Sequence, residues 1–226
     1  MNYTELKAAI IAYTDNQDTA FEAEVPVFVK QAEQRIFNMV QFPSLRKNVT
    51  GSTTSANKYL ACPADFLSAH SMAVVDNTTG AYEYLLNKDV NFIRQAYPTP
   101  SSTGFPKYYA LFGPQSNDIN ELTFILGPTP NATYVVELHY FYYPESIVTA
   151  STTWLGDNFD SVLLYASLVE AYTYMKGEQD MMQVYDTKFK EAMMLAKRLG
   201  DGLERSDSYR SGQYRLQPLP QNKGVN

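Results

Sequence analysis

The strongest hydrophobic pattern in the chain lies in residues 157–199 and predicts two long helices folded back on each other. The first helix is apolar on more than one face, because two neighbouring stripes at helical spacing are both apolar. These stripes contain Phe159, Val162, Leu163, Leu164, Tyr165, Ala166, Leu168, Val169, Ala171, Tyr172 and Met175. The second helix has a narrower seam, in which apolar residues recur after three and four positions. This seam contains Met182, Tyr185, Phe189, Ala192, Ala196 and Leu199.

The first of these helices needs cover on several sides, and two explanations of that cover are open. The N-terminal helices of the same subunit can fill the gap, or part of the surface can be an interface between subunits. In the second case the contacts would come from Phe159, Leu163, Leu164, Tyr165, Leu168 and Tyr172. Gly177 is placed to end the first helix and Asp180 to cap the second, which Gly200 and Gly202 are expected to end.

Two further helices are predicted at the N-terminal end. Residues 2–13 form a short helix, with Asn2 and Glu5 in the spacing of a capping box. A second helix follows the polar residues 14–19, with Pro26 near its first turn and Pro43 at its close. Its apolar face contains Phe28, Val29, Ala32, Ile36, Phe37, Met39 and Val40. Its solvent face contains Lys30, Glu33, Gln34 and Arg35.

Residues 44–144 have a different character, with short alternating runs separated by turn residues. Residues 47–52 and 56–60 predict a hairpin. Residues 71–75 and 81–86 predict another pair of strands, joined by a tight turn at 76–80.

The second half of this region predicts a short helix and three more strands. Asn87 is placed to cap the helix, which Pro98 stops. Strands at 107–112 and 121–126 flank a polar loop at 113–120. The longest strand, 133–143, has one apolar face and one half-apolar face that can meet a second sheet or another subunit.

The order of helices, strands and helices predicts an α+β fold. We expect a helical base, built from the N-terminal helices and the long C-terminal helices, with an inserted and mainly antiparallel β domain. The expected boundaries are 1–43 for the N-terminal helices, 44–145 for the β domain with its one short helix, 146–203 for the C-terminal helical hairpin and 204–226 for an extended tail.

The tail has neither a helical nor a strand period, and it contains two Tyr-Arg pairs. They are Tyr209 with Arg210 and Tyr214 with Arg215. Chain termini are often unstructured, whereas tyrosine and arginine are enriched at protein interfaces. An unstructured end and a docking tail are therefore both open.

Composition narrows the class of protein. With 45% hydrophobic and 19% charged residues among 226, the chain can bury a core. Its net charge of −6 argues against a domain that binds by neutralising phosphates, yet it suits a surface past which DNA slides. Its 18 tyrosines are typical of interfaces and of strands. The single cysteine, Cys62, excludes an internal disulfide framework, and no apolar run approaches the roughly 20 residues that span a bilayer. We therefore expect a soluble protein made in a reducing cytoplasm.

Candidate chemistry is sparse. His70 and His139 lie in or near different predicted strands, and their spacing does not pair either with the single cysteine, Cys62. Acids such as Asp65 and Glu137 could pair as in a glycosidase, but a chain with 24 acids offers many such pairs. The sequence has no phosphate-binding loop, dinucleotide fingerprint or zinc spacing. We therefore expect no enzymatic activity, no cofactor and no metal. Glu170, in the most apolar helix, is expected to pair with a neighbouring tyrosine or lysine.

Five segments together resemble head-to-tail adaptor proteins of short-tailed bacteriophages. They are Tyr59-Leu-Ala-Cys-Pro-Ala-Asp-Phe-Leu67, Tyr82-Glu-Tyr-Leu-Leu-Asn-Lys-Asp-Val-Asn-Phe-Ile93, Gly104-Phe-Pro-Lys-Tyr-Tyr-Ala-Leu-Phe112, Leu138-His-Tyr-Phe-Tyr-Tyr-Pro144 and Tyr174-Met-Lys-Gly177. Each segment is short and structural, but they cover nearly the whole chain in order.

The resemblance implies a homo-oligomeric ring of twelve copies, bound under the portal protein and facing the tail nozzle and tail fibres. DNA would pass through the ring transiently, and no membrane would be involved. The ring would belong to the virion neck and be assembled in the host cytoplasm. Residues 159–199 would pack the ring, and Tyr209, Arg210, Tyr214 and Arg215 would dock on the portal. The tail-side contacts would come from Asn77, Thr78, Gln115 and Asn117.

Two other functions compete with an adaptor. The first is another ring protein of the tail, such as a nozzle or stopper. The second is a virion-associated cell-wall hydrolase, which the acidic residues alone would permit.

Overall fold

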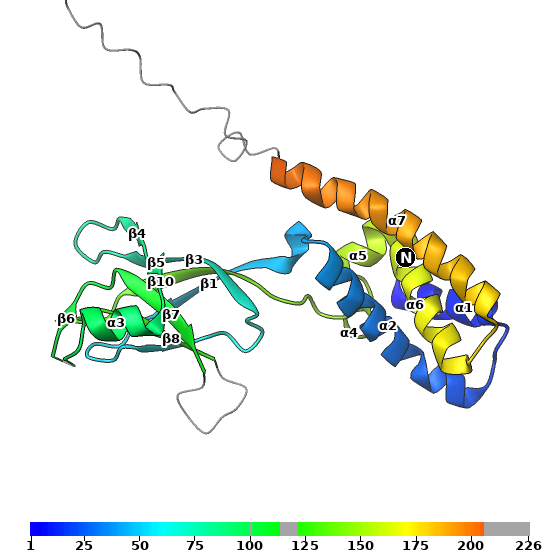
Figure 1. Cartoon of the computed structure of the whole chain (residues 1–226), viewed down its shortest axis with the longest axis horizontal. Coiled ribbons are helices and arrows are strands. Elements are labelled where there is room, and N and C mark those ends of the chain that lie inside the picture. The colour runs from blue at the N-terminus through cyan, green and yellow to red at the C-terminus, as the bar shows by residue number, and fades with distance from the viewer. Residues whose placement is uncertain (100, 114–121, 206–226) are drawn as a thin grey trace, which may run out of the picture. The chain divides into compact units, whose positions relative to one another are not determined.

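The chain forms two units, one of helices and one that holds all the described strands and the short helix α3 (Val90–Ala96) (Figure 1). In this computed structural model, residues 1–99, 101–113 and 122–205 are described, with side chains up to Arg198. The helical unit combines Met1–Pro43 with the chain from Glu145 onwards, and the β unit is Ser44–Pro144. The fold is therefore α+β, with strands inserted between two helical segments.

The helical unit is built around one apolar helix, α6. Its helices are α1 (Tyr3–Thr14), α2 (Thr19–Met39), α4 (Ile147–Ala150), α5 (Trp154–Asn158), α6 (Asp160–Met175) and α7 (Gln179–Arg205). In Figure 1, α6 lies among α1, α2 and α7, and all three pack on it, as does α5. Eight residues of α6 are buried: Val162, Leu163, Leu164, Ala166, Ser167, Leu168, Val169 and Ala171. Helices of the same chain therefore provide the cover for most of its apolar surface.

Local signals fix several helix ends as expected. The Asn2 side chain accepts a hydrogen bond from the Glu5 amide, and the Glu5 carboxylate accepts one from the Asn2 amide, both at 2.9 Å. This capping box satisfies two amides that have no partner inside the helix. At the end of α6, Lys176 takes the left-handed conformation, at φ 52°. Gly177 follows because a Cβ there would lie 2.7 Å from the ring of Tyr172.

Other expected helix limits are wrong. Gly200 and Gly202 lie inside α7, because a glycine costs a helix only about 1 kcal/mol and does not end it by itself. Asp180 does not cap α7 but lies in its first turn, where its charge favours the helix N-terminus. Pro26 lies well inside α2, which begins earlier than expected because the Asp18 side chain caps it through the Ala20 amide.

The β unit contains two four-stranded sheets that enclose an apolar core. The first sheet has the strand order β1 (Arg46–Ser52), β10 (Val135–Phe141), β3 (Ser68–Val75) and β4 (Tyr82–Tyr84), and is antiparallel. The second has the order β2 (Tyr59–Ala61), β8 (Thr123–Gly127), β7 (Tyr108–Phe112) and β5 (Leu86–Asn87), of which β5 and β7 are parallel. The core between them includes Phe66, Met72, Val74, Tyr109, Phe124, Leu126, Val136, Leu138 and Tyr140.

Three shorter elements complete the β unit. They are the helix α3 (Val90–Ala96) and the parallel strands β6 (Thr103–Gly104) and β9 (Thr129–Pro130). A 3-10 turn at Pro43–Leu45 precedes β1. The α3 cap is Asp89, whose carboxylate accepts from the Asn91 amide at 2.6 Å. Asn87, the expected cap, instead belongs to β5. Aspartate and asparagine are equally good N-cap residues, so residue type alone could not show which of Asn87 and Asp89 caps α3.

One predicted strand pairing is wrong. Residues 47–52 and 56–60 do not form a hairpin, because β1 pairs with β10 and β2 pairs with β8 in the other sheet. The pairing with β10 places Val49 opposite Leu138, where the two apolar side chains pack on the same face of the sheet. By contrast, β3 and β4 pair across the expected turn, and β7 pairs with β8.

Candidate interaction surfaces

The outer side of α7 carries apolar side chains that the helical unit leaves exposed. Met181, Val184 and Leu195 are 38%, 49% and 64% exposed and recur at coiled-coil spacing. Between them on the same stripe, Lys188 and Glu191 form an ion pair at 3.2 Å. Met194 extends the surface and is 62% exposed. We call these six residues the α7 stripe; it lies apart from the buried seam of Tyr185, Phe189 and Ala196.

The six residues proposed for a subunit interface on α6 differ in exposure. Leu163, Leu164 and Leu168 are buried inside the helical unit. Phe159, Tyr165 and Tyr172 are half-buried. Phe159 contacts the rings of Phe42 and Trp154, each at 5.5 Å, whereas the ring of Tyr172 packs on Tyr185 at 5.0 Å. Contact with another subunit stays a prediction. Only the half-buried residues Phe159, Tyr165 and Tyr172 have exposed surface with which to make it.

Three acidic side chains, Glu170, Asp186 and Glu33, make contacts between helices inside the helical unit. Arg35 lies 3.4 Å from Glu170 and 3.7 Å from Asp186, and its guanidinium sits over the Phe189 ring at 5.0 Å. Arg35 is therefore the partner of Glu170, where a tyrosine or lysine was expected. Glu33, expected on the solvent face, is 3% exposed and accepts a hydrogen bond from the Ile147 amide at 2.9 Å. Burial raises the pKa of Glu33.

The β3–β4 turn holds two of the proposed tail-side residues. The Asp76 carboxylate accepts hydrogen bonds from the Thr78 and Thr79 amides at 2.6 and 3.1 Å, which lowers the pKa of Asp76. The Asn77 side chain donates to the Thr133 carbonyl at 2.9 Å. The turn is thereby fixed, with Thr78 exposed at its tip. The other proposed contacts, Gln115, Asn117, Tyr209, Arg210, Tyr214 and Arg215, lie outside the described residues.

Both histidines line one hollow of about 310 Å³ on the outer face of the first sheet, with Arg46, Lys47, Asn48 and Tyr140. Beside two of its lining residues, Glu137 accepts a hydrogen bond from Asn48 at 2.6 Å and lies 3.4 Å from the His139 ring. The proximity of His70 and His139 could not be predicted from the sequence, because β3 and β10 are far apart in the chain and pair only in the folded sheet. Cys62 lines a different hollow, so the structure does not assemble a nucleophile and base from these three residues.

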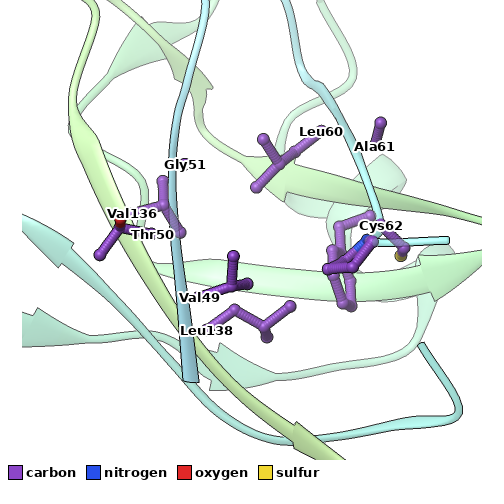
Figure 2. Close-up of a pocket in the computed structure, with 10 residues that line it drawn as sticks. Val49, Thr50, Gly51, Leu60, Ala61, Cys62, Val136 and Leu138 are labelled. Atoms are coloured by element: carbon purple, nitrogen blue, oxygen red, sulfur yellow. The ribbon is translucent and has the colours of Figure 1, made fainter. Parts of the chain in front are cut away.

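That second hollow is a groove of about 270 Å³ between β1 and β2, at one edge of both sheets (Figure 2). Apolar side chains form most of its walls. Its lining residues are Val49, Thr50, Gly51, Leu60, Ala61, Cys62, Pro63, Phe124, Val136 and Leu138. In the part of the chain that the structure describes, no group of three or more His, Cys, Asp or Glu could hold a metal ion. None of the described helices is long and apolar enough to cross a membrane.

The family model for the SU10 adaptor protein matches residues 1–216. The chain belongs to the SU10 adaptor protein family. No curated protein matches this chain.

Membership makes this chain a phage adaptor protein, a structural component of the virion neck. The match runs through both units of the adaptor and into the C-terminal tail as far as residue 216. Among the described residues of the adaptor, three surfaces are candidates for contact with partners: the α7 stripe, the β3–β4 turn and the β1–β2 groove.

Proposed function

We propose that this adaptor is one subunit of a ring between the portal and the tail nozzle, through which the genome leaves the capsid. The observation that carries the proposal is the α7 stripe. The helical unit completes its own core, yet it leaves the side chains of Met181, Val184, Met194 and Leu195 between 38% and 64% exposed. Contiguous exposed apolar side chains mark interaction sites in soluble proteins.

A ring requires two different complementary faces on each subunit, related by a rotation that closes. We assign one face to the α7 stripe. The half-buried rings of Phe159, Tyr165 and Tyr172 belong to the opposing face in this proposal. Such a contact would bury the stripe and leave the Lys188–Glu191 ion pair at its centre. Twelve copies would complete the ring, as in the phage adaptors that the sequence resembles.

The ends of the subunit receive different partners in this proposal. The C-terminal tail, from residue 204, docks on the portal through Tyr209, Arg210, Tyr214 and Arg215. The β domain, residues 44–145, faces the nozzle and the tail fibres. Asn77 and Thr78 make contacts there from the fixed β3–β4 turn, and Gln115 and Asn117 make contacts from the next polar loop.

The acidic balance of the adaptor suits a conduit for DNA. Its net charge of −6 repels phosphates, so a genome would pass without being held. Lysine or arginine in excess would instead bind DNA non-specifically. Assembly would take place in the host cytoplasm, before the tail is added.

Mass measurement of the purified protein, alone and mixed with its portal, tests the proposal. We expect a ring-sized complex of adaptor and portal, and a loss of this complex when the chain ends after Leu203. An adaptor that remains a single chain on the portal would contradict the ring. A complex that forms equally well without the tail would contradict portal docking through residues 209–215.

A further inference from the structure

The groove between β1 and β2 is an open edge of the β unit. Among the described strands, β1 pairs only with β10 and β2 pairs only with β8, so each is the last strand of its sheet. In Figure 2 the two strands run on either side of the groove, with Val49 and Leu60 on opposite walls. Beneath them lie Val136 and Leu138 of β10, which belong to the core.

The inner face of β1 is only partly covered by the described chain. Gly51 lies opposite Val136 in the sheet, so a side chain at position 51 would point to the core side, into the groove. No heavy atom lies within 4 Å of the position that a Cβ would take there. Every residue of β1 is exposed except Val49, which is half-buried. An edge strand above an apolar floor is the arrangement to which proteins add an extended peptide as a further strand.

We propose that this groove binds the segment Leu216-Gln-Pro-Leu-Pro220 from a second copy of this chain, which adds as a strand beside β1. The inference rests on the proposed ring, because the ring brings the second copy to the groove. The tail would then link each subunit to its neighbour as well as reach the portal.

The residue pattern of this segment fits the groove. Side chains alternate along a strand, so Leu216, Pro218 and Pro220 would share one face, and all three are apolar. That face would fill the space above Gly51. Gln217 and Gln221 would lie on the solvent side with Leu219.

The two prolines also fit the backbone of an added strand. Proline has no N–H, and it is tolerated in a sheet where that position faces away from the neighbouring strand. Pro218 and Pro220 are two residues apart, so both would face away from β1 while residues 217, 219 and 221 pair with it. Prolines on the outer side would also prevent any further strand from adding, which limits the contact to one copy.

The residues between α7 and this segment set how far the segment can reach. Ten residues, 206–215, separate the end of α7 from Leu216. Extended chain spans at most about 3.6 Å per residue, so they could bridge about 36 Å. This distance is comparable with the diameter of a small domain, about 30 Å.

Disulfide trapping with the full-length chain tests the proposal, because Cys62 is its only cysteine and lines the groove. One copy carries Cys62→Ser with a new cysteine at position 216, 217, 218, 219 or 220. It is mixed with a tagged wild-type copy and oxidised in air. We expect covalent heterodimers from the groove-facing substitutions Leu216→Cys, Pro218→Cys or Pro220→Cys, and little from Gln217→Cys or Leu219→Cys. Equal trapping at all five positions, or none at any, would overturn the proposal.

A matched pair of glycine substitutions shows whether the groove itself is responsible. Gly51→Leu in the wild-type partner would fill the groove and should abolish trapping, whereas Gly113→Leu, also in open space, should leave it unchanged. Circular dichroism checks that both variants fold. Trapping that survives Gly51→Leu contradicts the groove. Exchange between copies is checked with a Leu216→Cys chain that keeps Cys62, and a disulfide that forms within this chain in place of one between tagged and untagged copies contradicts it. The mass of the ring is measured on the same samples. A ring that forms without trapping contradicts this inference alone, whereas the absence of a ring contradicts the proposed function as well.

Discussion

The carboxylate of Glu33 in α2 accepts a hydrogen bond from the amide of Ile147, the first residue of α4, at 2.9 Å. The two residues are 114 positions apart, and the whole β unit lies between them in the chain. Within the helical unit, this bond attaches the returning chain to the N-terminal helices. It also satisfies a buried amide at a helix N-terminus, where no partner exists inside the helix.

Replacing Glu33 by alanine should therefore destabilise the helical unit. The Ile147 amide would remain buried without its acceptor, which costs about 1–3 kcal/mol. Glu33→Gln keeps an oxygen acceptor and should cost less. Urea unfolding followed by circular dichroism measures both, and equal stability of Glu33→Ala and the wild type would show that the bond contributes nothing.

The same carboxyl should make stability depend on pH. Burial raises the pKa of Glu33 above its ordinary 4.5, so the folded state binds this proton more tightly than the unfolded state does. The resulting stabilisation is complete below pH 4.5 and is lost as pH rises through the raised pKa. The stability of Glu33→Gln relative to the wild type should accordingly increase over that rise. Parallel stability curves for the two proteins across mildly acidic pH would contradict the shift.

Tyr185 should be among the last tyrosines to ionise. It is buried between α6 and α7 with Tyr172 and Tyr13 nearby, and burial raises its pKa to about 12. Because the folded pKa exceeds the unfolded value of 10, this stabilisation is present below pH 10 and is lost as pH rises through about 12. In a tyrosinate absorbance titration, Tyr185→Phe should remove one high-pH step. Loss of a step near pH 10 instead would contradict the burial.

The contacts of Arg35 should contribute little to stability. Its side chain is 34% exposed, and both carboxylate contacts, to Glu170 and Asp186, are longer than 3.3 Å. Partly exposed ion pairs contribute about 0–1 kcal/mol. A double-mutant cycle of Arg35→Met with Glu170→Gln should give a coupling energy below about 1 kcal/mol. A coupling several times larger would indicate that the pair is far better shielded from water than its exposure suggests.

Local features of this fold could be predicted from the sequence, and long-range features could not. The Asn2–Glu5 capping box and the β3–β4 turn depend on residues a few positions apart. The partner of β1 depends on the apolar face of β10, about 90 residues later, so local turn signals predicted the wrong hairpin. Glu33 lies at a polar position of α2, and only the arrival of α4 makes it buried.

The candidate surfaces show the same division. The pattern of α6 correctly indicated a helix that must be covered on several sides, but the pattern could not say that α1, α2, α5 and α7 supply most of the cover. The α7 stripe could have been found from the recurrence of Met181, Val184 and Leu195. The seam that contains Tyr185 and Phe189 is a more continuous apolar pattern than the α7 stripe, so the sequence pattern indicated only the seam. The groove beside β1 could not be predicted without its strand partners.

The α7 stripe should be needed for assembly and not for folding. Leu195→Glu places a charge where the side chain is 64% exposed, so the free energy of unfolding should change by less than about 0.5 kcal/mol. The ring contact should be lost, because a charge would be buried without a partner. Gln31→Glu, which is exposed on α2 and so lies outside the stripe, is the matched control. Ring formation by Leu195→Glu equal to that of Gln31→Glu would remove the stripe from the interface.

The most direct measurement is the cryo-electron-microscopy structure of the neck in assembled particles. The account predicts a closed ring of adaptor copies between the portal and the tail nozzle. In that ring, Met181, Val184, Met194 and Leu195 of each copy would be covered by the next copy. A single adaptor chain at the neck, or a ring in which these four side chains still face solvent, would contradict it.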